Sequence, residues 1–113
     1  MKIAIAKNGN TVSGHFGHCE GFETFEVENG KIVERVFIPS PEHQPGILPP
    51  FLADKGVNVI IAGGMGGAAV ELFKERGIAV VIGAQGDLDD VIKQYLSGEL
   101  KSTVSACEEH HHH

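Results

Sequence analysis

The loop between residues 13 and 19 carries two imidazoles and one thiol, which are side chains that bind transition metals. It reads Ser13-Gly14-His15-Phe16-Gly17-His18-Cys19. Imidazole suits iron and copper, and thiolate suits metal–sulfur units. The segment therefore predicts metal ligands at His15, His18 and Cys19. The alternative is a structural loop whose histidines hydrogen-bond the backbone and whose cysteine is a small buried apolar residue.

A second candidate binding element is a run of glycines around one methionine, Gly63-Gly64-Met65-Gly66-Gly67. It lies between an apolar run and a helical pattern, so its free N–H groups and the helix dipole favour an anion. A partial dinucleotide fingerprint, Gly64-x-Gly66-x-x-Ala69, lacks the acidic ribose partner expected about 20 residues later. We therefore expect no nucleotide. The alternative is a tight strand-to-helix turn in which only glycine fits.

The C-terminus carries a further candidate ligand set, Cys107 and His110, followed by three more histidines. This pattern suits a metal-binding tail. A remnant of an affinity tag explains it equally well. We expect residues 101–113 to form a flexible His-rich tail, native or a tag remnant, after a single domain of residues 1–100.

Length and composition favour one small domain with enough apolar residues to fill a core. The chain has 113 residues, 42% hydrophobic and 21% charged, and its net charge is −6 with histidine neutral. An acidic chain lacks the basic field that binding to nucleic acid or to an anionic membrane needs. There is no apolar run of about 18 residues and no signal-peptide pattern at the N-terminus. We therefore expect a cytoplasmic protein in which Cys19 and Cys107 are thiols or metal ligands rather than a disulfide.

Hydrophobic patterning predicts five strands and three helices. The strands are expected at residues 3–6, 22–28, 31–38, 57–62 and 78–82. The helices are expected at residues 48–55, 68–76 and 88–96. The second helix should bury Ala69, Leu72 and Phe73, and Asp87 can cap the third. Asn29-Gly30 predicts a type I′ hairpin turn, because that turn needs positive φ at both central residues.

These elements predict an α/β fold with a mixed five-stranded sheet. Numbered along the chain, the strands are expected in the order 3-2-1-4-5, with strand 2 antiparallel and helices on both faces, as three α/β/α layers. The carboxyl ends of the parallel strands 1, 4 and 5 then share one edge of the sheet. The loops at residues 7–21, 63–67 and 83–86 leave that edge, where open α/β sheets bind their ligands.

Four motifs, in order along the chain, carry a family resemblance. They are Ser13-x-His15-Phe16-Gly17, Gly63-Gly64-Met65-Gly66, Gly77-Ile78 leading into a strand, and Tyr95-Leu96-x-Gly98-x-Leu100. Together they resemble the dinitrogenase iron-molybdenum cofactor biosynthesis family, which includes NifX-like carriers and the C-terminal domain of the NifB type. The resemblance covers residues 1 to about 100. Many relatives carry arginine where this chain has His18, so a cationic group is replaced by a metal-binding one.

The resemblance implies a ribonuclease-H-like fold and the binding of an iron–sulfur or molybdenum-containing cluster precursor. It implies cofactor-binding residues at Ser13, His15, Phe16, Gly17, Gly63, Gly64, Met65, Gly66 and Gly67. It also implies a carrier. We expect that carrier to have no catalytic activity of its own, to be a monomer or a weak homo-oligomer, and to have cluster donor or acceptor proteins as its partners.

Two other functions stay open. One is a regulatory module that binds a nucleotide or another small anion on the glycine loops. The other is a ribonuclease-H-like nuclease, which needs clustered carboxylates that include one on the first strand. Residues 2–7 contain no carboxylate, which argues against the nuclease.

Overall fold

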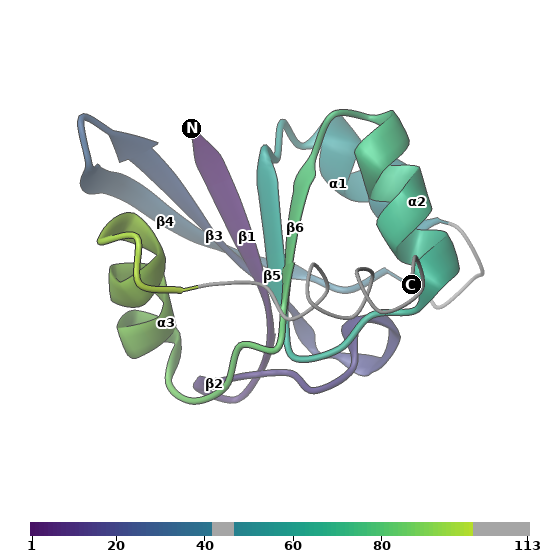
Figure 1. Cartoon of the computed structure of the whole chain (residues 1–113), viewed down its shortest axis with the longest axis horizontal. Coiled ribbons are helices and arrows are strands. Elements are labelled where there is room, and N and C mark those ends of the chain that lie inside the picture. Colours follow the sequence, from purple (N-terminus) through teal and green to yellow (C-terminus); the bar gives the residue numbers. More distant parts are fainter. Residues whose placement is uncertain (42–46, 101–113) are drawn as a thin grey trace, which may run out of the picture.

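The computed structural model describes residues 1–41 and 47–100 (Figure 1). Its elements follow in the order β1 (Lys2–Asn8), β2 (Thr11–Val12), the 3-10 turn η1 (Phe16–His18), β3 (Gly21–Glu28), β4 (Lys31–Pro39), α1 (Leu48–Asp54), β5 (Val59–Ala62), α2 (Gly67–Glu75), β6 (Ala79–Ile82) and α3 (Leu88–Leu96). The predicted tail at residues 101–113 lies outside the described residues, and so do Cys107 and His110.

The described strands form one mixed sheet of six strands. Five of them lie in the order β4-β3-β1-β5-β6, and the short β2 pairs with the end of β1. β3 runs antiparallel to both β1 and β4, whereas β5 is parallel to both β1 and β6. The predicted mixed α/β architecture is confirmed. The predicted count of five strands is wrong, because two residues of β2 are too few to show the alternation that identifies a strand.

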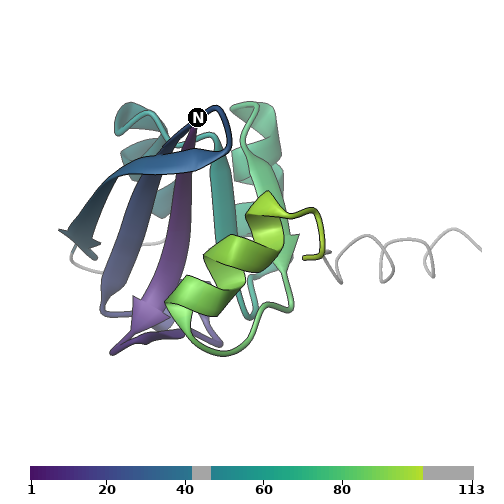
Figure 2. The same cartoon turned by 90° about the vertical axis from the view of Figure 1, so that its left-hand side faces the viewer.

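Helices cover both faces of the sheet, as Figures 1 and 2 show. α3 packs on one face, where Ile3 and Ile5 of β1 join its buried cluster. α1 and α2 pack on the other face with Ala4 and Ala6. A strand buried on both faces reads as a continuous apolar run, which is why residues 3–6 could be identified from the sequence. This central strand is a fixed base for the loop that follows Asn8.

The β3–β4 hairpin turns as predicted. Asn29 has φ of 54° and Gly30 has φ of 76°, both in the left-handed region that a type I′ turn requires.

The described helices bury faces that differ in detail from those predicted. In α2 the fully buried side chains are Val70 and Phe73, whereas Leu72 is only half-buried. In α3 the buried side chains are Leu88, Val91 and Ile92. Asp87 occupies the N-cap position of α3, but its side chain makes no capping hydrogen bond.

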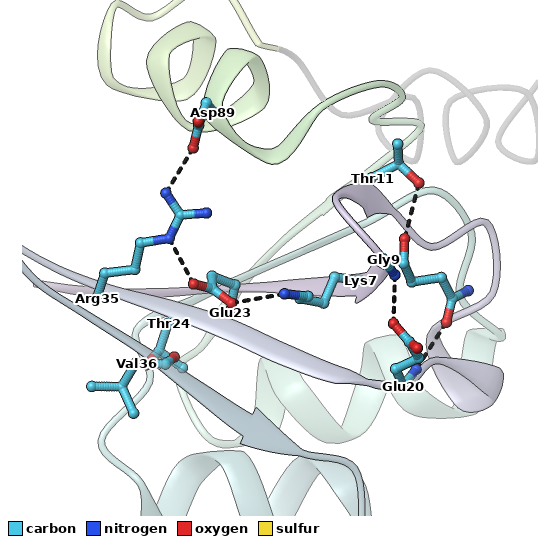
Figure 3. A network of polar contacts seen from close by, with 10 residues as sticks. Lys7, Gly9, Thr11, Glu20, Glu23, Thr24, Arg35, Val36 and Asp89 are labelled. Atoms are coloured by element: carbon cyan, nitrogen blue, oxygen red, sulfur yellow. Dashed lines mark hydrogen bonds and ion pairs between the residues drawn. The ribbon is translucent and has the colours of Figure 1, made fainter.

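A chain of ion pairs joins three strands to α3 (Figure 3). The Glu23 carboxylate accepts from Lys7 Nζ at 3.1 Å and from Arg35 Nε at 2.6 Å. Arg35 also donates from Nη1 to Asp89 at 2.7 Å. Because Glu23 is only 7% exposed, its charge depends on these partners rather than on water.

Among the described residues, no helix has the length and apolar character that crossing a membrane requires.

Candidate functional site at the carboxyl edge of the sheet

Backbone hydrogen bonds join the loops at the carboxyl ends of β1, β5 and β6. Ser13 N–H donates to Ala6 at 2.8 Å, and Gly63 N–H donates to Ser13 at 2.8 Å. Phe16 N–H donates to Gly64 at 2.9 Å, and Gly83 N–H donates to Gly63 at 3.1 Å. In Figure 1 the loop with η1 and the loop before α2 lie at the same end of the sheet, opposite the N-terminus. The convergence expected from the topology is therefore present.

Two glycines of the second loop are required by this close approach. A Cβ atom on Gly63 would lie 2.8 Å from Gly14 Cα and 2.9 Å from the Ser13 carbonyl oxygen. A Cβ atom on Gly64 would lie 2.7 Å from the Gly14 carbonyl oxygen. These neighbours are backbone atoms, which cannot move aside as a flexible side chain would. For Gly63 and Gly64, internal packing alone explains the residue type.

Packing does not explain three other glycines of the same loops. A Cβ atom on Gly14, Gly66 or Gly67 would meet nothing within 4 Å. None of the three has a positive φ, so their backbone conformation is open to other residues. Their missing side chains leave free space on the outer side of the loops.

The free space at Gly14 and Gly66 is part of a cavity of about 340 Å³, lined by Gly14, His15, Phe16, Gly17, His18, Gly64, Met65 and Gly66. Ser13, Gly63 and Gly67, which were also predicted to bind the cofactor, are not among its lining residues. Both imidazoles therefore lie at one cavity with the Met65 loop. Gly14 was not among the predicted site residues. Its position in the sequence between Ser13 and His15 could have identified it.

The cavity borders the N-terminus of α2, which presents uncapped amides. Gly66 is the N-cap residue, and the first turn contains no acidic side chain. Within the described part of the chain, no protein acceptor binds the N–H groups of residues 64–69. Such amides and the helix dipole together favour a negatively charged ligand.

The N-terminus of α3 has the opposite character, although it also follows a glycine loop. Asp87 is its N-cap residue, and Asp89 and Asp90 lie in its first turn. These carboxylates repel an anion. Of the loops at residues 63–67 and 83–86, the one before α2 therefore has the charge environment that suits an anion.

Ser13 and Phe16 hold the first loop from inside the protein. Ser13 is 1% exposed, and its hydroxyl is used in hydrogen bonds within the chain. The Phe16 ring is buried against the rings of Phe22 and Phe73, with centroids 5.6 and 5.3 Å away. Phe16 lines the cavity, but its ring anchors the loop to the core.

Cys19 points toward the protein rather than to the cavity. Its thiol donates to the Phe16 carbonyl oxygen at 3.4 Å, and the half-buried side chain packs on the α1–α2 core. Burial raises the pKa of the Cys19 thiol. Cys19 is absent from the residues that line the cavity.

The histidines and the cysteine therefore do not form a closed set of metal ligands. No group of three or more His, Cys, Asp or Glu side chains placed to hold a metal ion occurs in residues 1–41 and 47–100. Of the predicted metal ligands, the structure brings His15 and His18 to the cavity. The glycine loop and Met65 supply the rest of the polar and soft groups that line the cavity.

The fold and the cavity together define a class, namely a small α/β domain with a cavity between loops at the carboxyl edge of its sheet, the edge where open α/β sheets bind ligands. The family is shown by comparison with known proteins. The model of the dinitrogenase iron-molybdenum cofactor family matches residues 1–98, and the chain belongs to that family.

Individual relatives agree with this assignment. An uncharacterized Methanocaldococcus jannaschii protein, MJ0580, is 38% identical over 106 residues, which are 89% of this chain and 90% of that protein. The crystal structure of PH0822 superposes with a TM-score of 0.85 at 33% identity, covering 90% of this chain and 94% of that chain. A Thermotoga protein, provisionally described as a NifB protein, has a TM-score of 0.70 at 27% identity, covering 90% and 92%.

Proposed function

We propose that this protein binds and carries an anionic metal–sulfur cluster, or an iron-molybdenum cofactor precursor, without a catalytic step of its own. The observation that carries the proposal is the cavity in which His15 and His18 lie beside the uncapped amides of the Met65 loop. Membership in the iron-molybdenum cofactor family supports the same cargo class.

The two kinds of group suit different parts of such a cargo. Metal–sulfur clusters often carry net negative charge, and their sulfur atoms accept hydrogen bonds from backbone amides. An imidazole nitrogen can bond directly to an exposed metal of the cluster. Gly66 and Gly67 leave room for the body of the cluster, since a Cβ atom at either position would fill open space.

The absence of a three-ligand group among the described residues points to a pre-assembled cargo rather than a bare metal ion. A cluster that brings its own sulfide ligands needs few further bonds, which also allows release. We therefore propose cluster donor and acceptor proteins as partners, and a monomer or weak homo-oligomer as the carrying state.

His15 provides the first test. The His15 side chain is exposed beside the cavity, so His15→Ala should leave the free energy of unfolding within about 0.5 kcal/mol of the natural chain. Loss of one metal bond should weaken binding of tetrathiomolybdate or of a reconstituted iron–sulfur cluster by about tenfold or more. Anaerobic titration and thermal unfolding measure the two effects.

The background for this test is a full chain in which all four histidines at positions 110–113 are replaced by alanine. This removes the terminal histidines as competing ligands. Equal losses of stability and of affinity would contradict a ligand role for His15 and favour a structural one.

A second candidate is a module that binds a nucleotide or another small anion, because the uncapped amides of α2 accept any anion of suitable size. Competition separates the two. Phosphate or a nucleotide that displaces tetrathiomolybdate and binds more tightly would favour the module. The nuclease alternative has less support, because β1 contributes no carboxylate. The ribonuclease-H-like fold stays a proposal, since a fold does not carry an activity with it.

A further inference from the structure

We propose that Asn8 is a positioning residue for the candidate site. Its side-chain amide fixes both ends of the loop at residues 9–20 and, through Ser13, fixes the backbone of His15. The inference rests on the proposed function only in taking His15 as a cargo ligand.

Asn8 is the last residue of β1, and its amide reaches both ends of the loop. Its Oδ1 accepts from Glu20 N–H at 2.9 Å, where the loop leads back to β3. Its Nδ2 donates to Ser13 Oγ at 3.1 Å, just after β2. One planar side chain thus links the two ends of the loop, in addition to the backbone bonds that Ser13 N–H and Glu20 N–H donate to β1.

Further contacts reinforce the same junction (Figure 3). The Asn8 carbonyl oxygen accepts from Thr11 Oγ1 at 3.1 Å. The Glu20 carboxylate accepts from Gly9 N–H. These contacts hold the turn at residues 8–11, but neither of them reaches Ser13 or His15.

Ser13 transmits the position of Asn8 to His15. Ser13 Oγ donates to the His15 carbonyl oxygen at 3.0 Å and accepts from His15 N–H at 3.2 Å. Because Ser13 is 1% exposed, water cannot easily replace these bonds. The His15 side chain itself is exposed, so the direction of its imidazole depends on where the backbone of His15 is held.

The two hydrogen-bond partners of the side chain explain why residue 8 is an asparagine. Glu20 N–H is shared between Asn8 Oδ1 and the Lys7 carbonyl oxygen, which lies at 3.0 Å. Ser13 Oγ needs a donor because its own proton is directed to His15. Asparagine supplies an acceptor and a donor from one amide, whereas aspartate supplies only acceptors. An aspartate at this position would draw the Ser13 hydroxyl proton away from the His15 carbonyl.

The test compares Asn8→Ala, Ser13→Ala and the double variant in the full chain. Asn58→Ala is the matched control, because Asn58 Oδ1 also accepts a backbone N–H, that of Lys2, but at the start of β5 on the opposite edge of the sheet. Two readouts are used: amide exchange and chemical shift of His15 by NMR without ligand, and the dissociation constant for tetrathiomolybdate.

We expect faster exchange at the His15 amide in both single variants, and affinity about fivefold weaker in each. The affinity of the double variant should be no lower than that of the weaker-binding single variant, since both substitutions break the same connection from Asn8 through Ser13 to His15. Asn58→Ala should alter neither readout. Additive losses, or an unchanged His15 amide in Asn8→Ala, would overturn the proposal.

The experiment still tests the proposal if a variant does not fold or if the natural chain does not bind the probe. If Asn8→Ala fails to fold, Asn8→Asp replaces it, because aspartate retains an acceptor for Glu20 N–H. This variant should change the exchange and chemical shift of the His15 amide but not those of the Glu20 amide. An unchanged His15 amide would again contradict the proposal. If the natural chain does not bind tetrathiomolybdate, the proposed cargo is wrong, but the His15 amide still decides whether Asn8 positions the loop.

Discussion

At the scale of the residue, the candidate site separates side chains that are accessible to a ligand from those that hold the loops. His15 and His18 are exposed beside the cavity. Ser13 and Phe16 are buried and use their side chains inside the protein. Substitution of the first pair should change binding, whereas substitution of the second pair should change stability and loop position together.

Cys19 gives a residue-scale prediction. Because burial raises the pKa of its thiol, Cys19 should contain less thiolate than a free cysteine at mildly alkaline pH. In a Cys107→Ser chain, alkylation of Cys19 by iodoacetamide should therefore be several-fold slower than alkylation of a free cysteine, as followed by mass spectrometry. Alkylation as fast as that of the free amino acid would instead indicate an accessible thiolate, available as a ligand.

At the scale of the element, the loop before α2 predicts opposite outcomes for two of its glycines. Gly63→Ala should destabilise the fold by about 1–3 kcal/mol, because its Cβ would clash with the backbone of Ser13 and Gly14. Gly66→Val should cost at most about 1 kcal/mol, through the less favourable N-cap, yet weaken tetrathiomolybdate binding about tenfold by filling the cavity.

Urea unfolding and anaerobic titration of both glycine variants measure these effects. A folded Gly66→Val variant that binds as tightly as the natural chain would show that the cargo does not occupy this cavity.

The ion-pair network between the strands and α3 predicts a pH dependence of stability. Burial alone would raise the pKa of Glu23, but the hydrogen bonds and charges of Arg35 and Lys7 outweigh it and lower the pKa. A lowered pKa in the folded state stabilises the fold above the pKa of the unfolded chain, about 4.3 for glutamate. That stabilisation is lost as the pH falls through the folded-state pKa.

Glu23→Gln should therefore destabilise the protein by about 2 kcal/mol at neutral pH, and the difference should shrink below about pH 4. Urea unfolding at both pH values measures it. Glu28→Gln, an exposed position on the same strand, is the control and should change little. A Glu23→Gln difference independent of pH would contradict the electrostatic account.

At the scale of the whole molecule, an acidic chain would bind the proposed anionic cargo against its own electrostatic field. The net charge is −6, so the attraction in the cavity has to come from local amides and imidazoles. The repulsion is long-range and is screened by salt, whereas contacts within the cavity are screened much less.

Raising the ionic strength from about 0.01 M to about 0.15 M shortens the Debye length from about 30 Å to about 8 Å. Association of tetrathiomolybdate should therefore become about twofold faster or more, as stopped-flow absorbance would measure. A marked slowing with salt would mean that the cargo is steered by a positive surface, which the composition does not predict.

The sequence by itself determined most of the framework. Fully apolar runs identified β1 and β5, because strands buried on both faces need no polar side. The apolar run of β6 also identified that strand, although β6 lies at the edge of the sheet and buries only Val81 and Ile82. Asn29 and Gly30 identified the hairpin, because few residues tolerate positive φ. The motif around His15 and Met65 identified the family, which the match over residues 1–98 confirms.

Only the tertiary structure decided the roles of individual loop residues. Gly63 and Gly66 are alike in the sequence, but the approach of Gly14 makes the first a packing requirement and leaves the second free. Cys19 neighbours His18 in the chain, yet its thiol turns toward the core. Asn8 gave no signal, because its partners Ser13 and Glu20 become neighbours only when the loop closes. Patterns along a chain report local preference, whereas clearance, burial and side-chain direction depend on contacts between distant segments.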